Sequence, residues 1–115
     1  MMVFLLLISV FLASFNALES SQWHLHNTFA PQRDINVLPV WKEGVKGENV
    51  TVCIIDDGVD FDHPSLQPAA RLDLSFDLNR NDPEARPRNE KDRHGTRCAG
   101  QIVARPGPCG SGVAP

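Results

Sequence analysis

The chain has 115 residues, of which 42% are apolar and 22% are charged, and its formal net charge is -3 at pH 7. This composition is that of a globular domain and excludes an intrinsically disordered segment. The small negative charge gives no reason to expect nucleic acid or an anionic membrane surface as a partner. At this length the chain holds one domain at most, and half of a larger fold would leave apolar faces uncovered.

Residues 1–19 are dominated by the apolar run from Val3 to Ala13, which is too short to span a bilayer comfortably. We interpret residues 1–19 as a secretory signal peptide or hydrophobic leader. No Lys or Arg precedes the run, and its small-residue cleavage pattern is irregular, so the alternative is a buried strand or a segment mistaken for a leader. A leader would place the product on the secretory pathway or outside the cell.

Three cysteines, Cys53, Cys98 and Cys109, cannot all pair within one chain. None has the C-x-x-C spacing of a zinc site, which argues against zinc. In a secreted chain, one cysteine would stay free or would bond to a partner outside these residues.

The first half of the chain leads to a pair of carboxylates. Residues 20–31 are polar and predict an extended arm, and residues 34–41 predict a short helix with Pro39 in its first turn. The β-branched apolar run 50–55 predicts a parallel strand that is buried on both faces. It ends at Asp56-Asp57-Gly58, the end of a strand at which open α/β sheets place functional residues.

The second half predicts a helix after a polar loop. Residues 63–66 predict a turn entering a short helix, and residues 72–78 a second strand. Residues 79–91 are rich in Asn, Asp, Arg and Pro and predict a surface loop. Small residues within 94–104 favour a helix packed closely against the sheet, and the rest of the chain is rich in Gly and Pro.

The order of two residues indicates serine-protease chemistry. That chemistry needs a nucleophile, an imidazole that carries its proton and a carboxylate that orients the imidazole. Asp56 precedes His94 by 38 residues, in the Asp, His, Ser order of subtilisins. Taken separately, Asp56 could be a turn acid and His94 a polar residue at a helix start.

The segments 54–58 and 94–100 resemble the aspartate and histidine signatures of the subtilase superfamily. The Asp56-Asp57 pair and Arg97-Cys98 resemble its kexin/furin branch in particular. Further matches are Gln22-Trp23-His24-Leu25, Arg33-Asp34-Ile35-Asn36-Val37 and Ser75-Phe76-Asp77. Residues 20–115 therefore resemble the N-terminal part of a subtilisin-like peptidase catalytic domain.

The resemblance implies an α/β fold, the subtilisin-like three-layer sandwich with a mostly parallel sheet, of which this chain supplies the first strands and the histidine helix. It implies that Asp56 is the charge member of the triad and His94 the general acid/base. Asp57 matches a position that contacts basic substrate residues. The implied activity is a serine endopeptidase that cleaves proproteins after basic residues through an acyl-enzyme, with protein or peptide substrates as partners.

Calcium is the implied cofactor. Asp77, Asp82 and Glu84 match a calcium site of the family, and hard oxygen ligands suit that ion. The alternative is a solvated acidic loop.

This sequence also departs from the family pattern. Ser65 stands where the first calcium site of the family has a carboxylate, and the loop before Cys109 is about two residues shorter, so we expect no such site. Lys91 replaces an acidic residue that contacts substrate, which weakens the expected preference for a basic residue upstream of the cleaved one. By family, Cys98 is unpaired and Cys109 bonds to a cysteine further along. The sequon at Asn49 opens a predicted buried strand and is not expected to carry a glycan.

The serine and the oxyanion-hole asparagine of the family are not found in these residues. None of Ser65, Ser75 and Ser111 has the context of a nucleophile at a helix start. We therefore expect the 115-residue chain alone to be inactive. The main interpretation is a full-length secreted processing endopeptidase, which could be anchored downstream in a Golgi-type membrane. The two alternatives are a truncated peptide-binding module and a fragment without function. The oligomeric state is not indicated.

Overall fold

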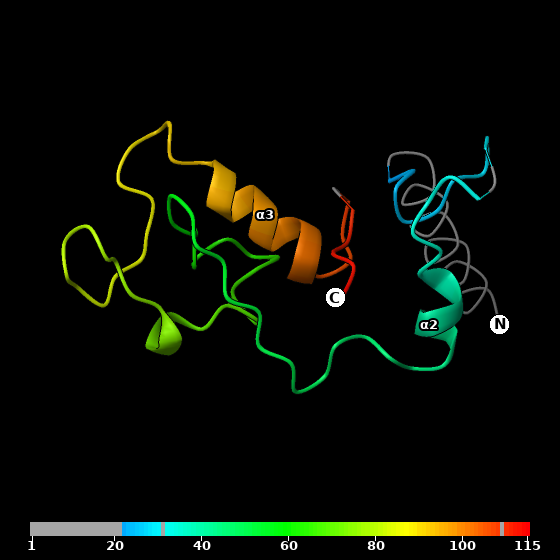
Figure 1. The fold of residues 1–115 in the computed structure, drawn as a ribbon, viewed down its shortest axis with the longest axis horizontal. Coiled ribbons are helices and arrows are strands. Elements are labelled where there is room, and N and C mark those ends of the chain that lie inside the picture. Colours follow the sequence, from blue (N-terminus) through cyan, green and yellow to red (C-terminus); the bar gives the residue numbers. More distant parts are fainter. Residues whose placement is uncertain (1–21, 31, 109) are drawn as a thin grey trace, which may run out of the picture.

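The computed structural model describes residues 22–30, 32–108 and 110–115, so the predicted leader lies outside the described residues. Three helical elements occur in the described part: α2 (Leu38–Lys42), the 3-10 helix η1 (Leu72–Leu74) and α3 (His94–Val103). Figure 1 shows α2 and α3 in separate parts of the molecule, joined by an extended green segment. Within these same residues, no helix is both long and apolar enough to cross a membrane.

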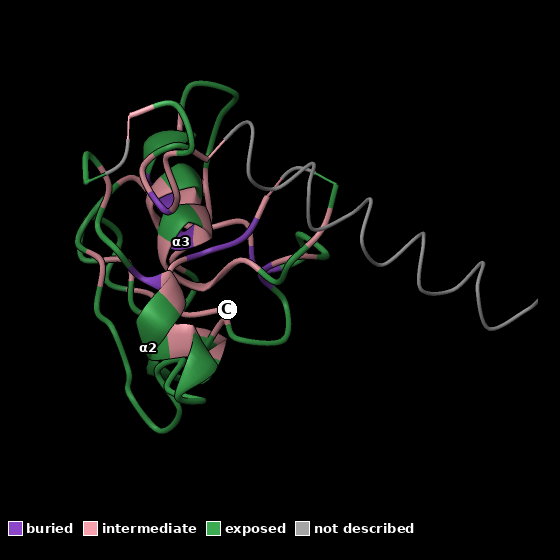
Figure 2. Ribbon diagram, turned by 90° about the vertical axis from the view of Figure 1, so that its right-hand side faces the viewer, coloured by how far each residue is buried: buried purple, intermediate pink, exposed green. Residues whose placement is uncertain are grey.

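Five apolar side chains from segments far apart in sequence are buried in the described part of the chain: Leu25, Val37, Phe61, Leu66 and Ala99. Figure 2 shows that the buried stretches of the ribbon, in purple, are few and short. Leu25 lies in a turn at residues 23–25, where the sequence predicts an extended arm. The core is small, so turns and loops are held mainly by hydrogen bonds.

Helix α2 confirms the short helix predicted within residues 34–41. Pro39 lies in its first turn, where the missing N–H of proline costs no helical hydrogen bond. The side chain of Asp34 accepts hydrogen bonds from the amides of Asn27 (2.7 Å) and Asn36 (2.8 Å), which ties the chain entering the helix to the preceding turn.

Helix α3 confirms the helix predicted within residues 94–104, but the predicted packing against a sheet is wrong, because the described residues form only two isolated β-bridges. Its small residues Gly95 and Ala99 are buried, as expected for residues four apart on one helix face. A Cβ atom at Gly95 would lie 2.4 Å from the carbonyl oxygen of Gly58. Glycine therefore lets the start of α3 lie directly against the backbone that follows the aspartate pair.

The segment 110–115 joins the two helical parts. The amides of Gly112, Val113 and Ala114 donate to carbonyls at the end of α3, on Ala104, Gln101 and Ile102. Toward the other part, the indole of Trp41 donates to the carbonyl of Val113 at 2.9 Å. This segment thus satisfies helix-end carbonyls that would otherwise have no partner.

The predicted buried strand at residues 50–55 does not form in the described structure. Val50, Val52 and Ile55 are 69%, 51% and 89% exposed, and the only β-bridges among the described residues are Asp77 with Asp82 and Gly107 with Gly110. A central strand needs neighbours on both edges and both faces, and the described residues supply none. The apolar residues of this run favour burial, but in the described structure their side chains remain exposed.

Two further predictions for the middle of the chain are wrong, wholly or in part. Residues 63–66 form the predicted turn, but the short helix does not follow, since the chain continues in hydrogen-bonded turns to residue 69. The segment predicted as a strand, residues 72–78, begins with the 3-10 helix η1. The guanidinium of Arg71 donates two hydrogen bonds to the carboxylate of Asp73 (2.8 and 2.6 Å), and the hydroxyl of Ser75 donates to the Arg71 carbonyl. These local side-chain bonds favour a tight turn over an extended backbone. The predicted surface loop at 79–91 is present.

Candidate functional site

The two residues that the sequence places 38 positions apart meet at the start of α3. Nδ1 of His94 lies 2.6 Å from Oδ2 of Asp56. The Asp56 side chain is only 18% exposed, whereas that of His94 is 74% exposed. The imidazole is therefore held on one side by a half-sheltered carboxylate and is open to solvent on the other.

Asp56 is held in its ionised form. The amide of Asp57 donates to Oδ1 of Asp56 at 2.8 Å. This bond and then the hydrogen bond with His94 lower the pKa of the Asp56 carboxyl. An ionised carboxylate only accepts hydrogen bonds, so Nδ1 of His94 carries the proton of this contact and Nε2 is left as the basic nitrogen.

Asp57 faces α3. Its Oδ2 accepts the amide of His94 at 3.0 Å and its Oδ1 accepts the amide of Gly95 at 2.7 Å. The two neighbouring aspartates thus hold the same histidine in different ways. Asp56 binds the imidazole and Asp57 binds the backbone that carries it.

Cys98 lies one helical turn after His94, with its sulfur 3.6 Å from Nδ1 and 3.9 Å from Nε2 of the imidazole. Together with Asp56, these side chains form the only group of three metal-type ligands within 4.8 Å of one another among the described residues. Because Asp56 and His94 hydrogen bond directly, we describe the group as an acid–base pair with a thiol beside it. Both described cysteines, Cys53 and Cys98, are free, and Cys109 lies outside the described residues.

The acidic residues of the loop at 77–84, here called the acidic loop, lie around Arg88, which the sequence analysis did not identify as a site residue. Nη2 of Arg88 lies 3.2 Å from Oδ2 of Asp77, 3.0 Å from Oδ2 of Asp82 and 2.8 Å from the carbonyl oxygen of Glu84. Desolvation raises the pKa of Asp77, but hydrogen bonds from the Arg80 amide and the Arg88 side chain lower it overall. Within residues 77–84, three acidic residues stand against one basic residue, and this local excess is the signal that a cation belongs there.

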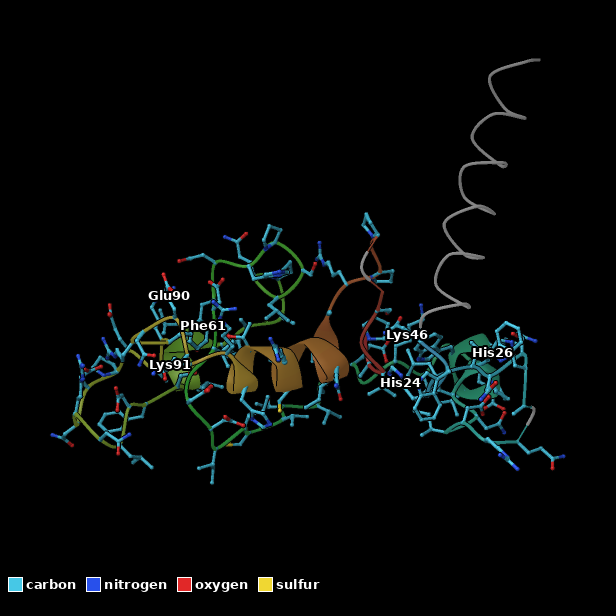
Figure 3. All side chains as sticks on the ribbon, turned by 90° about the horizontal axis from the view of Figure 1, so that it is seen from above. His24, His26, Lys46, Phe61, Glu90 and Lys91 are labelled. Carbon is cyan, nitrogen blue, oxygen red and sulfur yellow. The ribbon has the colours of Figure 1, made fainter. Side chains whose placement is uncertain are left out.

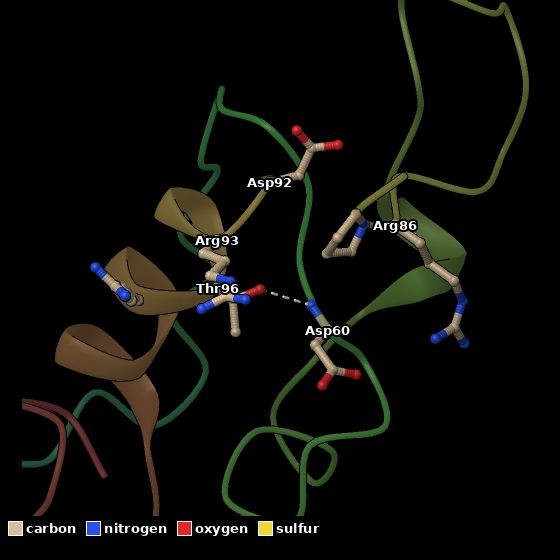
Figure 4. A pocket seen from close by; sticks show the side chains of 7 residues that line it. Asp60, Arg86, Asp92, Arg93 and Thr96 are labelled. Atoms are coloured by element: carbon tan, nitrogen blue, oxygen red, sulfur yellow. Dashed lines mark hydrogen bonds between the residues drawn. The ribbon is translucent and has the colours of Figure 1, made fainter. Parts of the chain in front are cut away.

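A shallow hollow lies between the loop and the first turns of α3. Figure 4 shows its lining, which includes Asp60, Arg86 and Thr96, and the hydrogen bond of 3.0 Å from the Asp60 amide to the Thr96 hydroxyl. Figure 3 places Glu90 and Lys91 in the loop that leads into α3. Lys91 is exposed, so its charge faces solvent beside the candidate site.

Comparisons with known proteins show the family of the chain. Residues 47–115, more than half of the chain, match the subtilase family model. The chain is 47% identical over 95 residues to a dibasic-processing endoprotease of Schizosaccharomyces pombe, with 82% of this chain and 13% of that protein covered. It is 46% identical over 98 residues to proprotein convertase subtilisin/kexin type 7 of Mus musculus (81% and 13%) and 44% identical over 98 residues to the protease KEX1 of Kluyveromyces lactis (84% and 13%). The chain thus spans only a small part of the length of these relatives.

Proposed function

Because the chain belongs to the kexin-like group of the subtilase family, we propose that it supplies the aspartate and histidine of a serine endopeptidase active site. The endopeptidase cleaves proproteins after basic residues. Family membership implies the α/β subtilisin fold, and we assign residues 20–115 to the N-terminal part of the catalytic domain and residues 1–19 to a leader that directs it to the secretory pathway.

The contact between Asp56 and His94 carries this proposal. Nε2 of His94 takes the proton of a serine hydroxyl as the serine attacks a peptide carbonyl, and later returns that proton to the leaving amine. Asp56 keeps Nδ1 protonated and stabilises the imidazolium that forms between these steps. The open side of the imidazole leaves room for the nucleophile and the substrate.

We infer that the serine comes from outside these residues, because none of Ser65, Ser75 and Ser111 lies at the start of a helix. The hydroxyl of Ser75 donates to the Arg71 carbonyl at 2.8 Å and that of Ser111 to the Gly112 carbonyl at 3.0 Å, so neither is directed at His94. The 115-residue chain alone is therefore expected not to hydrolyse peptides, because an Asp–His pair without a nucleophile and oxyanion donors has nothing to activate.

The test compares two proteins: the 115-residue chain, and a longer product that includes the proposed serine, here called the natural-length protein. Each is assayed with two fluorogenic peptides, which carry Arg-Arg or Ala-Ala directly before the reporter group. We expect the natural-length protein to cleave the Arg-Arg peptide in strong preference and the chain to cleave neither. A natural-length protein that cleaves neither peptide would support the alternative, an inactive product that at best binds peptides. Cleavage by the chain that disappears in His94→Ala would contradict its inactivity.

The acidic loop supports calcium as a cofactor. Two carboxylates and a backbone carbonyl already converge on the positive charge of Arg88, and oxygen ligands of this kind fit calcium. We assign the ion to Asp77, Asp82 and Glu84, although the described structure does not bring all three carboxylates within 4.8 Å of one another. The ion would draw them together and stabilise a loop that carries no regular secondary structure. Arg88 then competes with calcium for the same oxygens.

Calorimetric titration of the natural-length protein tests this assignment. Asp82→Asn is expected to lower the calcium stoichiometry, and Arg88→Ala to strengthen binding, because a competing cation is removed. Asp73→Asn is the matched control, since the carboxylate of Asp73 is exposed and paired with Arg71. Equal stoichiometry in the wild type and in Asp82→Asn would leave a solvated acidic loop as the better description.

A further inference from the structure

The first turn of α3 has no cap of its own. The residue before the helix is Arg93, which makes no side-chain capping bond. The first amides of a helix have no partner within the helix, and Asp57 is the described group that accepts the amides of His94 and Gly95, across 37 and 38 residues of sequence. A carboxylate at this end of a helix also interacts favourably with the helix dipole.

The surrounding backbone packs closely around this contact. Gly58 has a φ of +114°, and a Cβ atom there would lie 2.7 Å from the backbone at Arg86 and Pro87. The hydroxyl of Thr96 accepts the amide of Asp60 at 3.0 Å. The segment after the aspartate pair is thus held between the loop and α3, and Asp57 is the charged link between that segment and the helix.

Among the described residues, the other polar contact of the imidazole is with the Cys98 sulfur, 3.6 Å from Nδ1 and 3.9 Å from Nε2. The side chain of His94 is 74% exposed, and its one close carboxylate partner is Asp56, 2.6 Å away. The position of the imidazole relative to Asp56 therefore depends on where the backbone of His94 lies. That backbone is fixed by the carboxylate next to Asp56 in the sequence.

We propose that Asp57 is a positioning residue: its carboxylate binds the first two amides of α3 and thereby holds His94 in register with Asp56. This inference rests on the proposed function, since a positioning role matters only if the pair performs acid–base chemistry. It differs from the role that the resemblance implies, in which the charge of Asp57 contacts a basic substrate residue. A small displacement of a catalytic group lowers the rate of reaction, and a shift of about 1 Å can lower it about a hundredfold.

The two roles predict different results for a pair of substitutions. Asp57→Asn keeps an oxygen acceptor for one amide of α3 and removes the charge, whereas Asp57→Ala removes both. In the natural-length protein, we measure kcat and KM with two peptides that share Arg at the cleaved position and carry either Lys or Ala just upstream. Asp62→Asn is the control, because it removes a nearby charge whose partner is Arg86 and not α3.

A positioning role predicts that Asp57→Ala lowers kcat about ten- to a hundredfold with both peptides, and that Asp57→Asn restores part of the loss. A loss confined to the Lys peptide, and equal in the two variants, would overturn the proposal. Amide hydrogen exchange at residues 94 and 95 gives a readout independent of catalysis, and it should be faster in Asp57→Ala than in the wild type. If the wild type cleaves neither peptide, the proposed function fails and the exchange result alone decides the role of Asp57; unchanged exchange rejects it.

Discussion

Gly95→Ala is expected to lower the free energy of unfolding by about 3 kcal/mol, which is the upper part of the range for overpacking a tight contact. The new Cβ atom would lie 2.4 Å from the Gly58 carbonyl oxygen and 3.1 Å from both Cβ of Asp56 and Oδ1 of Asp57. The Gly58 carbonyl oxygen belongs to the backbone, and Cβ of Asp56 is attached directly to it. Neither atom can move away as the end of a flexible side chain would. Urea denaturation of the natural-length protein, monitored at α3 by hydrogen exchange, measures the loss.

Gly100→Ala is the matched control within the same helix. A Cβ atom at Gly100 has no heavy atom within 4 Å. Alanine there is expected to stabilise the helix by roughly 0.5–1 kcal/mol, because glycine has the greater backbone entropy to lose. If both substitutions changed stability by the same amount, the close approach of α3 to the aspartate segment would not exist in the protein.

The sequence predicted α2 and α3 because their signals are local. Pro39 suits a first turn, and the small residues of α3 recur on one helix face. The pairing of Asp56 with His94 was also expected, since the order of the two residues matches a known signature. The structure adds the distance between them and the difference in their exposure.

Other features could not be predicted from local patterns. The run 50–55 has the composition of a buried strand, but a strand forms only when neighbours complete its hydrogen bonds and cover its faces. The bonds from Asp57 to α3 span 37 and 38 residues and leave no periodic trace in the sequence. The place of Cys98 beside the imidazole could have been found, because residues four apart on a helix lie on one face.

His94→Ala in the natural-length protein is expected to lower kcat on the order of 10⁴-fold or more, because the serine loses its general base. Asp56→Asn is expected to have a comparable effect, since the amide would favour the wrong tautomer of the imidazole. The hydrogen bond of 2.6 Å between the two side chains is the reason to expect that they act as one unit. The control is Asp62→Asn, whose carboxylate is 75% exposed and paired with Arg86.

The double-mutant cycle of these two residues tests the central claim most directly. Residues that act as a unit have strongly non-additive effects. The double variant His94→Ala/Asp56→Asn is therefore expected to have a kcat about equal to that of His94→Ala alone, measured with the Arg-Arg peptide. A double variant whose loss is the product of the two single losses, or a His94→Ala variant that keeps wild-type kcat, would contradict the assignment of Asp56 and His94 as the acid–base pair.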